Sequence, residues 1–164
     1  MLIVPFDNSP LSRAALVRAR QFDQILEEGV IAVSVIPSQN AQYARERGWL
    51  ADTDPFDDDQ IVATLRDGVA EIAPDATFEY ITIDRWAPHG VIGNKIRKFA
   101  RSNDATIVFL GSQDAGRLVR SVSVGSSVVT DRGYDTMIIS NPELPEIPTL
   151  DEVVPPDKLL GEDS

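Results

Sequence analysis

Two groups of small polar residues in the second half of the chain have the composition of an anion-binding site. Gly111-Ser112 ends the apolar run Thr106–Leu110, and Gly125-Ser126-Ser127 begins thirteen residues after Ser112. A buried strand that stops at a glycine leaves backbone N–H groups beyond its carboxyl end. A Gly-Ser-Ser that opens a helix adds N–H groups, hydroxyls and a positive dipole end. On one edge of a parallel sheet, the two groups would form a nucleotide phosphate pocket. The alternative is that both glycines only close tight turns.

The elements that must position these groups begin at the amino end of the chain. Leu2-Ile3-Val4-Pro5-Phe6 is nearly continuously apolar, as in a strand covered on both faces. Asp7-Asn8-Ser9-Pro10 then breaks the run, with Ser9 a suitable helix N-cap and Pro10 a suitable first helical residue. The sequence therefore predicts a strand, a turn and a helix in this order.

Strand and helix periodicities alternate along the rest of the chain. The first helix has Ile25 and Leu26 among its apolar positions, and Gly29 is expected to close it. The further expected strands are Val30–Ile36, Phe78–Ile83, Thr106–Leu110 and Thr136–Ser140. The further expected helices lie near Ala41–Arg47 and at Asp58–Ala73, Val91–Ser102 and Ser126–Arg132. This alternation predicts an α/β fold, an open five-stranded parallel sheet with helices on both faces, which is Rossmann-like.

The composition changes after Ser140 and suggests two parts, a domain at 1–140 and an acidic, Pro-rich tail at 141–164. The tail contains five Pro, seven acidic residues and one Lys, which is too polar to build a core. Its apolar pairs, Val153-Val154 and Leu159-Leu160, could dock on the domain or on a partner.

The overall composition excludes several classes of function. The 164 residues include no Cys, so disulfides, thiolate chemistry and Cys-based metal sites are ruled out. With 26 acidic and 15 basic residues, the surface should repel nucleic acid and anionic membranes. The beginning of the chain has no basic region or long apolar segment, so we expect a cytoplasmic protein without a membrane span.

Other residues that could carry chemistry have simpler explanations. His89 is the sole His and is expected to be a loop residue, and Asp57-Asp58-Asp59 is expected to be a solvated helix start. Trp49 and Trp86 are expected to be packing residues, because no basic stripe accompanies them. No Ser-His-Asp set and no Gly-x-x-x-x-Gly-Lys-Ser/Thr motif is present, so we expect no catalytic residues and at most weak ATP hydrolysis.

Several segments together resemble the universal stress protein family of the UspA type. They are VPFDNSPLSRAAL, VIAVSVIP, IRKFARSNDATIVFLGSQ, VGSSVV and TMIIS. The resemblance spans about Leu2–Ser140, and its most specific parts are the Asp-x-Ser after the first strand and the pairing of Gly-Ser with a later Gly-Ser-Ser. It implies the five-stranded parallel fold of adenine-nucleotide alpha-hydrolase-like domains. In this family many members dimerise through the last strand, and many bind ATP.

The resemblance assigns a nucleotide role to nine residues. Asp7 would contact the adenine end, flanked by the backbone of Pro5 and Phe6, and Val35 would offer its backbone N–H and C=O to the adenine edge. The residues implied at the ribose and phosphates are Gly111, Ser112, Gly125, Ser126 and Ser127. The ligand would be ATP or AMP, with Mg²⁺ present only alongside ATP. The alternative for Asp7 and Ser9 is an Asx turn followed by a helix N-cap.

One departure from the family pattern concerns the phosphate loop. ATP-binding members resemble Gly-x-x-Gly, nine residues, then Gly-Ser or Gly-Thr, whereas this chain has Asp114 at the second Gly and a loop one residue longer. A carboxylate about 4 Å from a phosphate charge costs about 4 kcal/mol at an effective dielectric near 20. That would weaken binding roughly several hundredfold unless Asp114 turns outward or Arg117 and Arg120 offset its charge.

Two functions therefore stay open at this point. One is a nucleotide-binding stress or regulatory protein, and the other is a nucleotide-free dimeric interaction module of the same fold. The expected dimer contact is the fifth strand, residues 136–140, because an unpaired apolar edge strand favours pairing with its two-fold mate. The protein clients of either are not specified by the sequence.

The charge pattern also leads to a prediction about salt. Asp outnumbers Glu, 17 to 9, and Lys occurs only at Lys95, Lys98 and Lys158, which is typical of proteins from a salt-rich cytosol. We therefore predict a halophilic protein whose melting temperature rises between low and molar KCl, since screening removes carboxylate repulsion. A melting temperature that stays constant or falls over this range would contradict the prediction.

Overall fold

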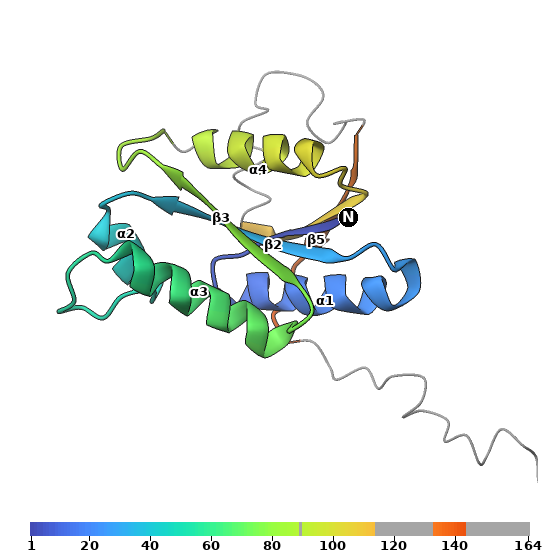
Figure 1. Cartoon of the computed structure of the whole chain (residues 1–164), viewed down its shortest axis with the longest axis horizontal. Helices are drawn as coiled ribbons and strands as arrows, with labels where there is room; N and C mark the ends of the chain where they lie inside the picture. Colours follow the sequence, from blue (N-terminus) through green and yellow to red (C-terminus); the bar gives the residue numbers. More distant parts are fainter. Residues whose placement is uncertain (89, 114–132, 144–164) are drawn as a thin grey trace, which may run out of the picture.

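The computed structural model describes residues 1–88, 90–113 and 133–143 (Figure 1). Its elements are β1 (Leu2–Pro5), α1 (Pro10–Leu26), β2 (Val30–Pro37), α2 (Ala41–Glu46), α3 (Asp58–Ile72), β3 (Thr77–Ile83), α4 (Gly90–Ser102), β4 (Ile107–Gly111) and β5 (Asp135–Ile139). His89, the expected helix Ser126–Arg132 and most of the tail lie outside the described residues. None of the described helices is long and apolar enough to cross a bilayer.

The five strands form one parallel sheet in the order β3-β2-β1-β4-β5, which confirms the predicted fold class. The central strand β1 is paired on both sides, with Leu2 opposite both Val30 and Ile107. From β1 the chain first adds strands on one side and then returns to add β4 and β5 on the other. The carboxyl ends of β1 and β4 therefore meet where the strand order reverses, which is where open α/β sheets bind ligands.

Helices cover both faces of the sheet, as Figure 1 shows, with α1 and α3 on one side and α4 on the other. The alternation of side chains along β1 divides the core accordingly. Leu2, Val4 and Phe6 pack with residues of α1 and α3, whereas Ile3 packs in a cluster with Ala100 of α4. All four residues of β1 are buried, which explains the continuous apolar run in the sequence.

The end of α1 differs from the sequence prediction. The helix stops at Leu26 and is capped by Glu27 in the left-handed conformation, with φ 52°, so Gly29 does not close it. Ile25 is 83% exposed and Leu26 41% exposed, so these two apolar positions of the helix do not belong to its buried face. Gly29 instead takes φ 84° directly before β2, where its N–H donates to Oδ1 of Asp23 at 2.7 Å.

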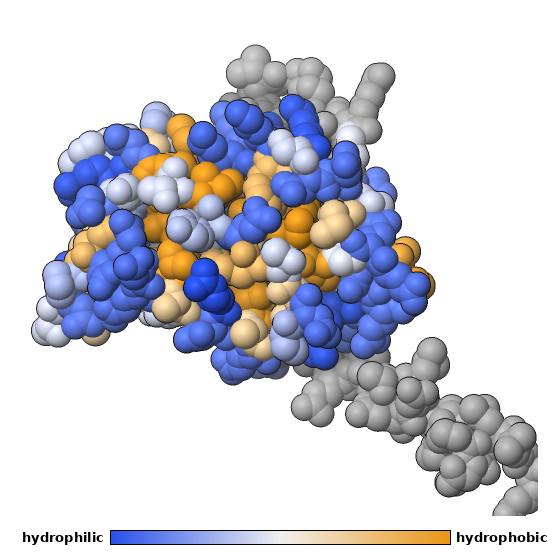
Figure 2. All heavy atoms as spheres, in the orientation of Figure 1, coloured by the Kyte–Doolittle hydropathy of each residue, from blue (hydrophilic) through white to orange (hydrophobic). Residues whose placement is uncertain are grey.

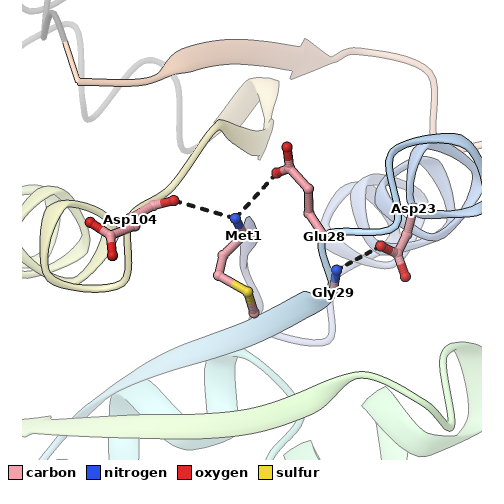
Figure 3. A network of polar contacts seen from close by, with 5 residues as sticks. All are labelled: Met1, Asp23, Glu28, Gly29 and Asp104. Carbon is pink, nitrogen blue, oxygen red and sulfur yellow. Dashed lines mark hydrogen bonds and ion pairs between the residues drawn. The ribbon is translucent and has the colours of Figure 1, made fainter.

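The amino terminus is tied to the beginning of the sheet by polar contacts (Figure 3). The ammonium group of Met1 lies 3.2 Å from Oε2 of Glu28 and donates to the carbonyl of Asp104 at 3.3 Å. A hydrogen bond with the Thr106 side chain, followed by the contacts with the ammonium group, lowers the pKa of the Glu28 carboxyl. These contacts link β1 to the residues that precede β2 and β4.

The lowered pKa of Glu28 predicts a contribution to the stability of the fold that is present at neutral pH and lost in acid. A carboxyl with a lower pKa in the folded state stabilises the fold above its unfolded pKa, and this contribution is lost as the pH falls through the folded value. We expect Glu28→Gln to lower the melting temperature at neutral pH and to flatten its decline below the ordinary carboxyl pKa of 4.5. Glu79→Gln, at an exposed position on β3, is the control. Melting curves that fall in parallel for Glu28→Gln and the unmodified chain would contradict this assignment.

Candidate functional site

The turn after β1 places Asp7 at the carboxyl edge of the sheet. Oδ1 of Asp7 accepts a hydrogen bond from the backbone N–H of Ser9 at 2.9 Å, which forms an Asx turn. Ser9 is the N-cap of α1, and its hydroxyl accepts from the N–H of Ser12 at 3.2 Å. The Asx turn and the helix N-cap, which were the alternative for Asp7 and Ser9, are thus present. The turn uses one carboxylate oxygen of Asp7, and no described residue contacts the other oxygen in a hydrogen bond.

Other elements hold this turn in place. Asn8 has φ 64°, and its Oδ1 accepts from Nη1 of Arg13 at 2.8 Å, while Nη2 of Arg13 lies 3.3 Å from Glu71 of α3. A Cβ added to Gly68 of α3 would lie 2.7 Å from Oδ1 of Asn8. The absence of a side chain at Gly68 therefore allows the turn to lie directly against α3.

Trp49 supports the same turn from the loop after α2. Its indole N–H donates to the carbonyl of Asp7 at 2.8 Å, and its side chain is only 3% exposed. Tyr43 packs against it edge to face at 5.7 Å between ring centroids. The prediction that Trp49 is a packing residue is confirmed, but its contact with Asp7 also makes it part of the site. Trp86, by contrast, is 78% exposed, so the same prediction was wrong for Trp86.

A small hollow brings together the residues that the resemblance places at the adenine. Its walls include Pro5 at the end of β1, Phe6 and Asp7 directly after it, and Val35 of β2. The remaining wall residues are Val33, Tyr43, Trp49, Ile92 and Ile96. Its volume is about 30 Å³, which is enough to hold a water molecule.

The backbone of Val35 faces the hollow because β1 ends before β2 does. Pro5 lies opposite Val33, and the N–H of Phe6 donates to the carbonyl of Val33 at 2.8 Å, after which β1 turns away while β2 continues to Pro37. In a strand, the N–H and C=O of every second residue point to the same side. The N–H and C=O of Val35 therefore point to the same side as those of Val33, where β1 no longer runs beside β2. They form a donor and acceptor pair next to Asp7.

The end of β4 lies beside the amino end of α1. A Cβ added to Gly111 would be 2.9 Å from Cβ of Leu11, so a larger residue would push β4 away from α1. Gly111 serves this close approach rather than a tight turn, and Ser112 follows it directly. Gly125, Ser126, Ser127 and Asp114 lie outside the described residues, so the structure neither brings them to Gly111 nor separates them from it.

The remaining candidates do not add to this site. Asp57 is the N-cap of α3 and Asp58 and Asp59 lie in its first turn, as a helix start requires. In the described ranges, no group of three or more His, Asp or Glu side chains could hold a metal ion. Among the described residues that line the hollow, the polar groups are the carboxylate of Asp7, the hydroxyl of Tyr43, the indole N–H of Trp49 and the backbone groups of Val35.

Comparison with protein families agrees with this geometry. The model of the universal stress protein family matches residues 1–132. The chain belongs to the universal stress protein family. Within this universal stress protein, the match covers β1, the Asp7 turn, β2 and β4, and it includes the two Gly-Ser groups of the sequence. A search of curated proteins finds no match.

Among solved structures, the chain is similar to one described as "Crystal structure of universal stress protein in complex with cAMP". The identity is 18%, the alignment covers 85% of this chain and 95% of the other, and the TM-score is 0.47. The cAMP belongs to that protein.

The contact between Trp49 and Asp7 predicts a stability difference between the two tryptophans. Trp49→Phe keeps most of the ring volume but leaves the carbonyl of Asp7 without its donor, which should cost about 1–3 kcal/mol of unfolding free energy. Trp86→Phe, at the exposed tryptophan, should change it by less than about 0.5 kcal/mol. Urea unfolding of both variants measures the difference. Equal losses would show that the indole N–H does not fix the turn.

Proposed function

We propose that this universal stress protein binds an adenine nucleotide, ATP or AMP, at the carboxyl edge of β1, β2 and β4. The observation that carries the proposal is the convergence of Asp7 and the backbone of Val35 on one hollow at the carboxyl ends of β1 and β2. β1 is also one of the two strands between which the strand order reverses. Family membership supports the proposal, since many members bind ATP. Mg²⁺ would accompany ATP on the phosphates and is not required for AMP.

Each wall of the hollow suits a part of an adenine ring. The amino group of adenine is a donor and the adjacent ring nitrogen an acceptor, which matches the C=O and N–H of Val35. The second carboxylate oxygen of Asp7 is a further acceptor, and Pro5 and Ile92 offer apolar contact to the ring. The sugar and phosphates would extend toward Gly111 and Ser112 and then to Gly125, Ser126 and Ser127.

The hollow must widen to enclose this ligand. A purine ring does not fit completely into a hollow of about 30 Å³, so full enclosure of the ring requires part of the wall to move. Tyr43 lies only partly buried on the short helix α2, and Ile92 lies in the first turns of α4. The free energy of this opening lowers the apparent affinity, because only the open population binds.

Calorimetry at high KCl tests the proposal, with Mg-ATP and AMP as ligands. We expect dissociation constants below millimolar, and Asp7→Asn should weaken binding about tenfold or more. An Asn at this position still offers Oδ1 to the N–H of Ser9 and keeps the turn, but it turns the second oxygen into a donor. Asp75→Asn removes the same charge at the opposite edge of the sheet and should leave affinity unchanged. No heat at millimolar ligand would overturn the proposal.

Asp114 can be tested in the same titration. Asp114→Asn removes the charge and Asp114→Gly also restores the glycine of ATP-binding relatives, so we expect Asp114→Gly to strengthen binding of ATP. Because AMP carries fewer charges, the gain should be smaller for AMP. Equal affinities for the unmodified chain and Asp114→Gly would place this carboxylate away from the phosphates.

A second candidate function is a nucleotide-free homodimer that serves as an interaction module. Two observations favour it, the small volume of the hollow and the outer edge of the sheet. β5 is an edge strand, and Ile138 is 51% exposed there while Ile139 is buried. Pairing of β5 with a second copy would satisfy its open backbone edge and cover Ile138. The strand runs from Asp135 to Ile139, one residue earlier than expected.

The dimer is tested by sedimentation at micromolar concentration and molar KCl. We expect about twice the monomer mass of 18.0 kDa for the unmodified chain and the monomer mass for Ile138→Lys, since a charge there would be buried unpaired. Tyr80→Lys changes an equally exposed residue on the opposite edge strand β3 and should leave the dimer intact. A monomeric unmodified chain, or a dimer lost through Tyr80→Lys alone, would contradict the β5 contact.

A further inference from the structure

A second, larger hollow lies at the beginning of α4, on the side of β3. Its volume is about 490 Å³ and its apolar walls are formed by Ile83, Trp86, Ala87, Pro88 and Val91. Figure 2 shows hydrophobic side chains gathered beside α4 and surrounded by hydrophilic ones. Thr82, Asp84 and Lys95 complete the lining, and Oδ1 of Asp84 accepts from the backbone N–H of Trp86. An exposed Trp next to an apolar hollow indicates a contact surface.

The helix that borders this hollow has a charge opposite to that of the chain. α4 contains Lys95, Arg97, Lys98 and Arg101 and no acidic residue, in a chain with a net charge of −11. Lys95 and Lys98 are exposed and one turn apart, which places their side chains on the same side of the helix. The ion pairs among the described residues, Met1 with Glu28 and Arg13 with Glu71, do not involve them.

The tail of the same chain has the complementary pattern. In Leu159-Leu160-Gly161-Glu162-Asp163, an apolar pair is followed by an acidic pair. The hollow is likewise adjacent to a basic pair, because Lys95 lines it and Lys98 lies on the next turn. The tail leaves the domain after β5, and the eighteen residues between Ile139 and Lys158 can span roughly 60 Å, enough to reach any part of one domain.

We propose that residues 159–163 of the tail dock on this surface of their own domain. Leu159 and Leu160 enter the hollow beside Trp86, and Glu162 and Asp163 pair with Lys95 and Lys98. The covalent link supplies an effective concentration in the millimolar range, so a weak contact suffices. A separate acidic protein or a nucleic acid has no such link and meets the repulsion of the whole acidic surface.

Disulfide trapping tests the proposal well because the chain has no Cys of its own. One full-length variant carries Asn94→Cys on α4 with Ser164→Cys, and its control carries Ala70→Cys on α3 with Ser164→Cys. Both helix positions are exposed and within reach of the tail. In 0.1 M KCl with oxidised glutathione, we expect the disulfide between positions 94 and 164 to form about tenfold faster than the control disulfide between positions 70 and 164. Equal rates would overturn the proposal.

Charge exchange distinguishes a specific contact from accidental proximity. Lys95→Glu with Lys98→Glu should lower the trapping rate of the α4 pair to that of the control, and adding Glu162→Lys with Asp163→Lys should restore it. A trapping rate that stays high in Lys95→Glu with Lys98→Glu would contradict the assigned pairs. A reduced rate that Glu162→Lys with Asp163→Lys does not restore would contradict them too. An equimolar mixture of chains with Asn94→Cys or Ser164→Cys alone should give few linked dimers. Efficient linking there would show that the tail docks on a second copy and would overturn docking within one chain.

Discussion

The position of the turn between β1 and α1 depends on hydrogen bonds from parts of the chain that are distant in sequence. Ser34 of β2 donates its buried hydroxyl to the carbonyl of Phe6 at 2.5 Å, and Trp49 donates to the carbonyl of Asp7 at 2.8 Å. These carbonyls lie at the end of a buried strand, where an unpaired acceptor would be costly. The same donors therefore stabilise the fold and fix the carboxylate of Asp7 beside the backbone of Val35.

This arrangement makes the structural role of Asp7, the Asx turn before α1, compatible with the proposed contact to a nucleotide. The Asx turn uses Oδ1 and fixes the direction of the carboxylate, so the second oxygen is oriented before any ligand arrives. The early end of β1 leaves the N–H and C=O of Val35 without a neighbouring strand. A parallel sheet whose central strand is short thus leaves an edge of unpaired backbone groups, and Asp7 is the one charged side chain among the described residues that line the hollow.

The sequence predicted the parts of this design that depend on local patterns. The buried run at β1, the cap at Ser9 and the alternation of strands and helices each follow from periodicity and turn chemistry. The contacts of Trp49 with Asp7 and of Gly68 with Asn8 join residues about 40 and 60 positions apart, so no local pattern could show them. Trp86 was wrongly expected to be a packing residue, because the absence of a basic stripe does not show what covers the side chain. The apolar Ile25 is exposed because periodicity gives the apolar positions of a helix but not where its neighbours end.

The charge of α4, with four basic residues and no acidic one, is opposite to the net charge of −11 of the whole chain. Net negative charge keeps the surface hydrated and repels anionic partners, but it also repels an acidic tail from most of the domain. The basic face of α4 is the exception, and screening in high salt weakens its attraction while apolar contact in the adjacent hollow persists. A docking segment that combines Leu159-Leu160 with Glu162-Asp163 would therefore keep its place over a wide range of salt, with charge setting its register and apolar burial its strength.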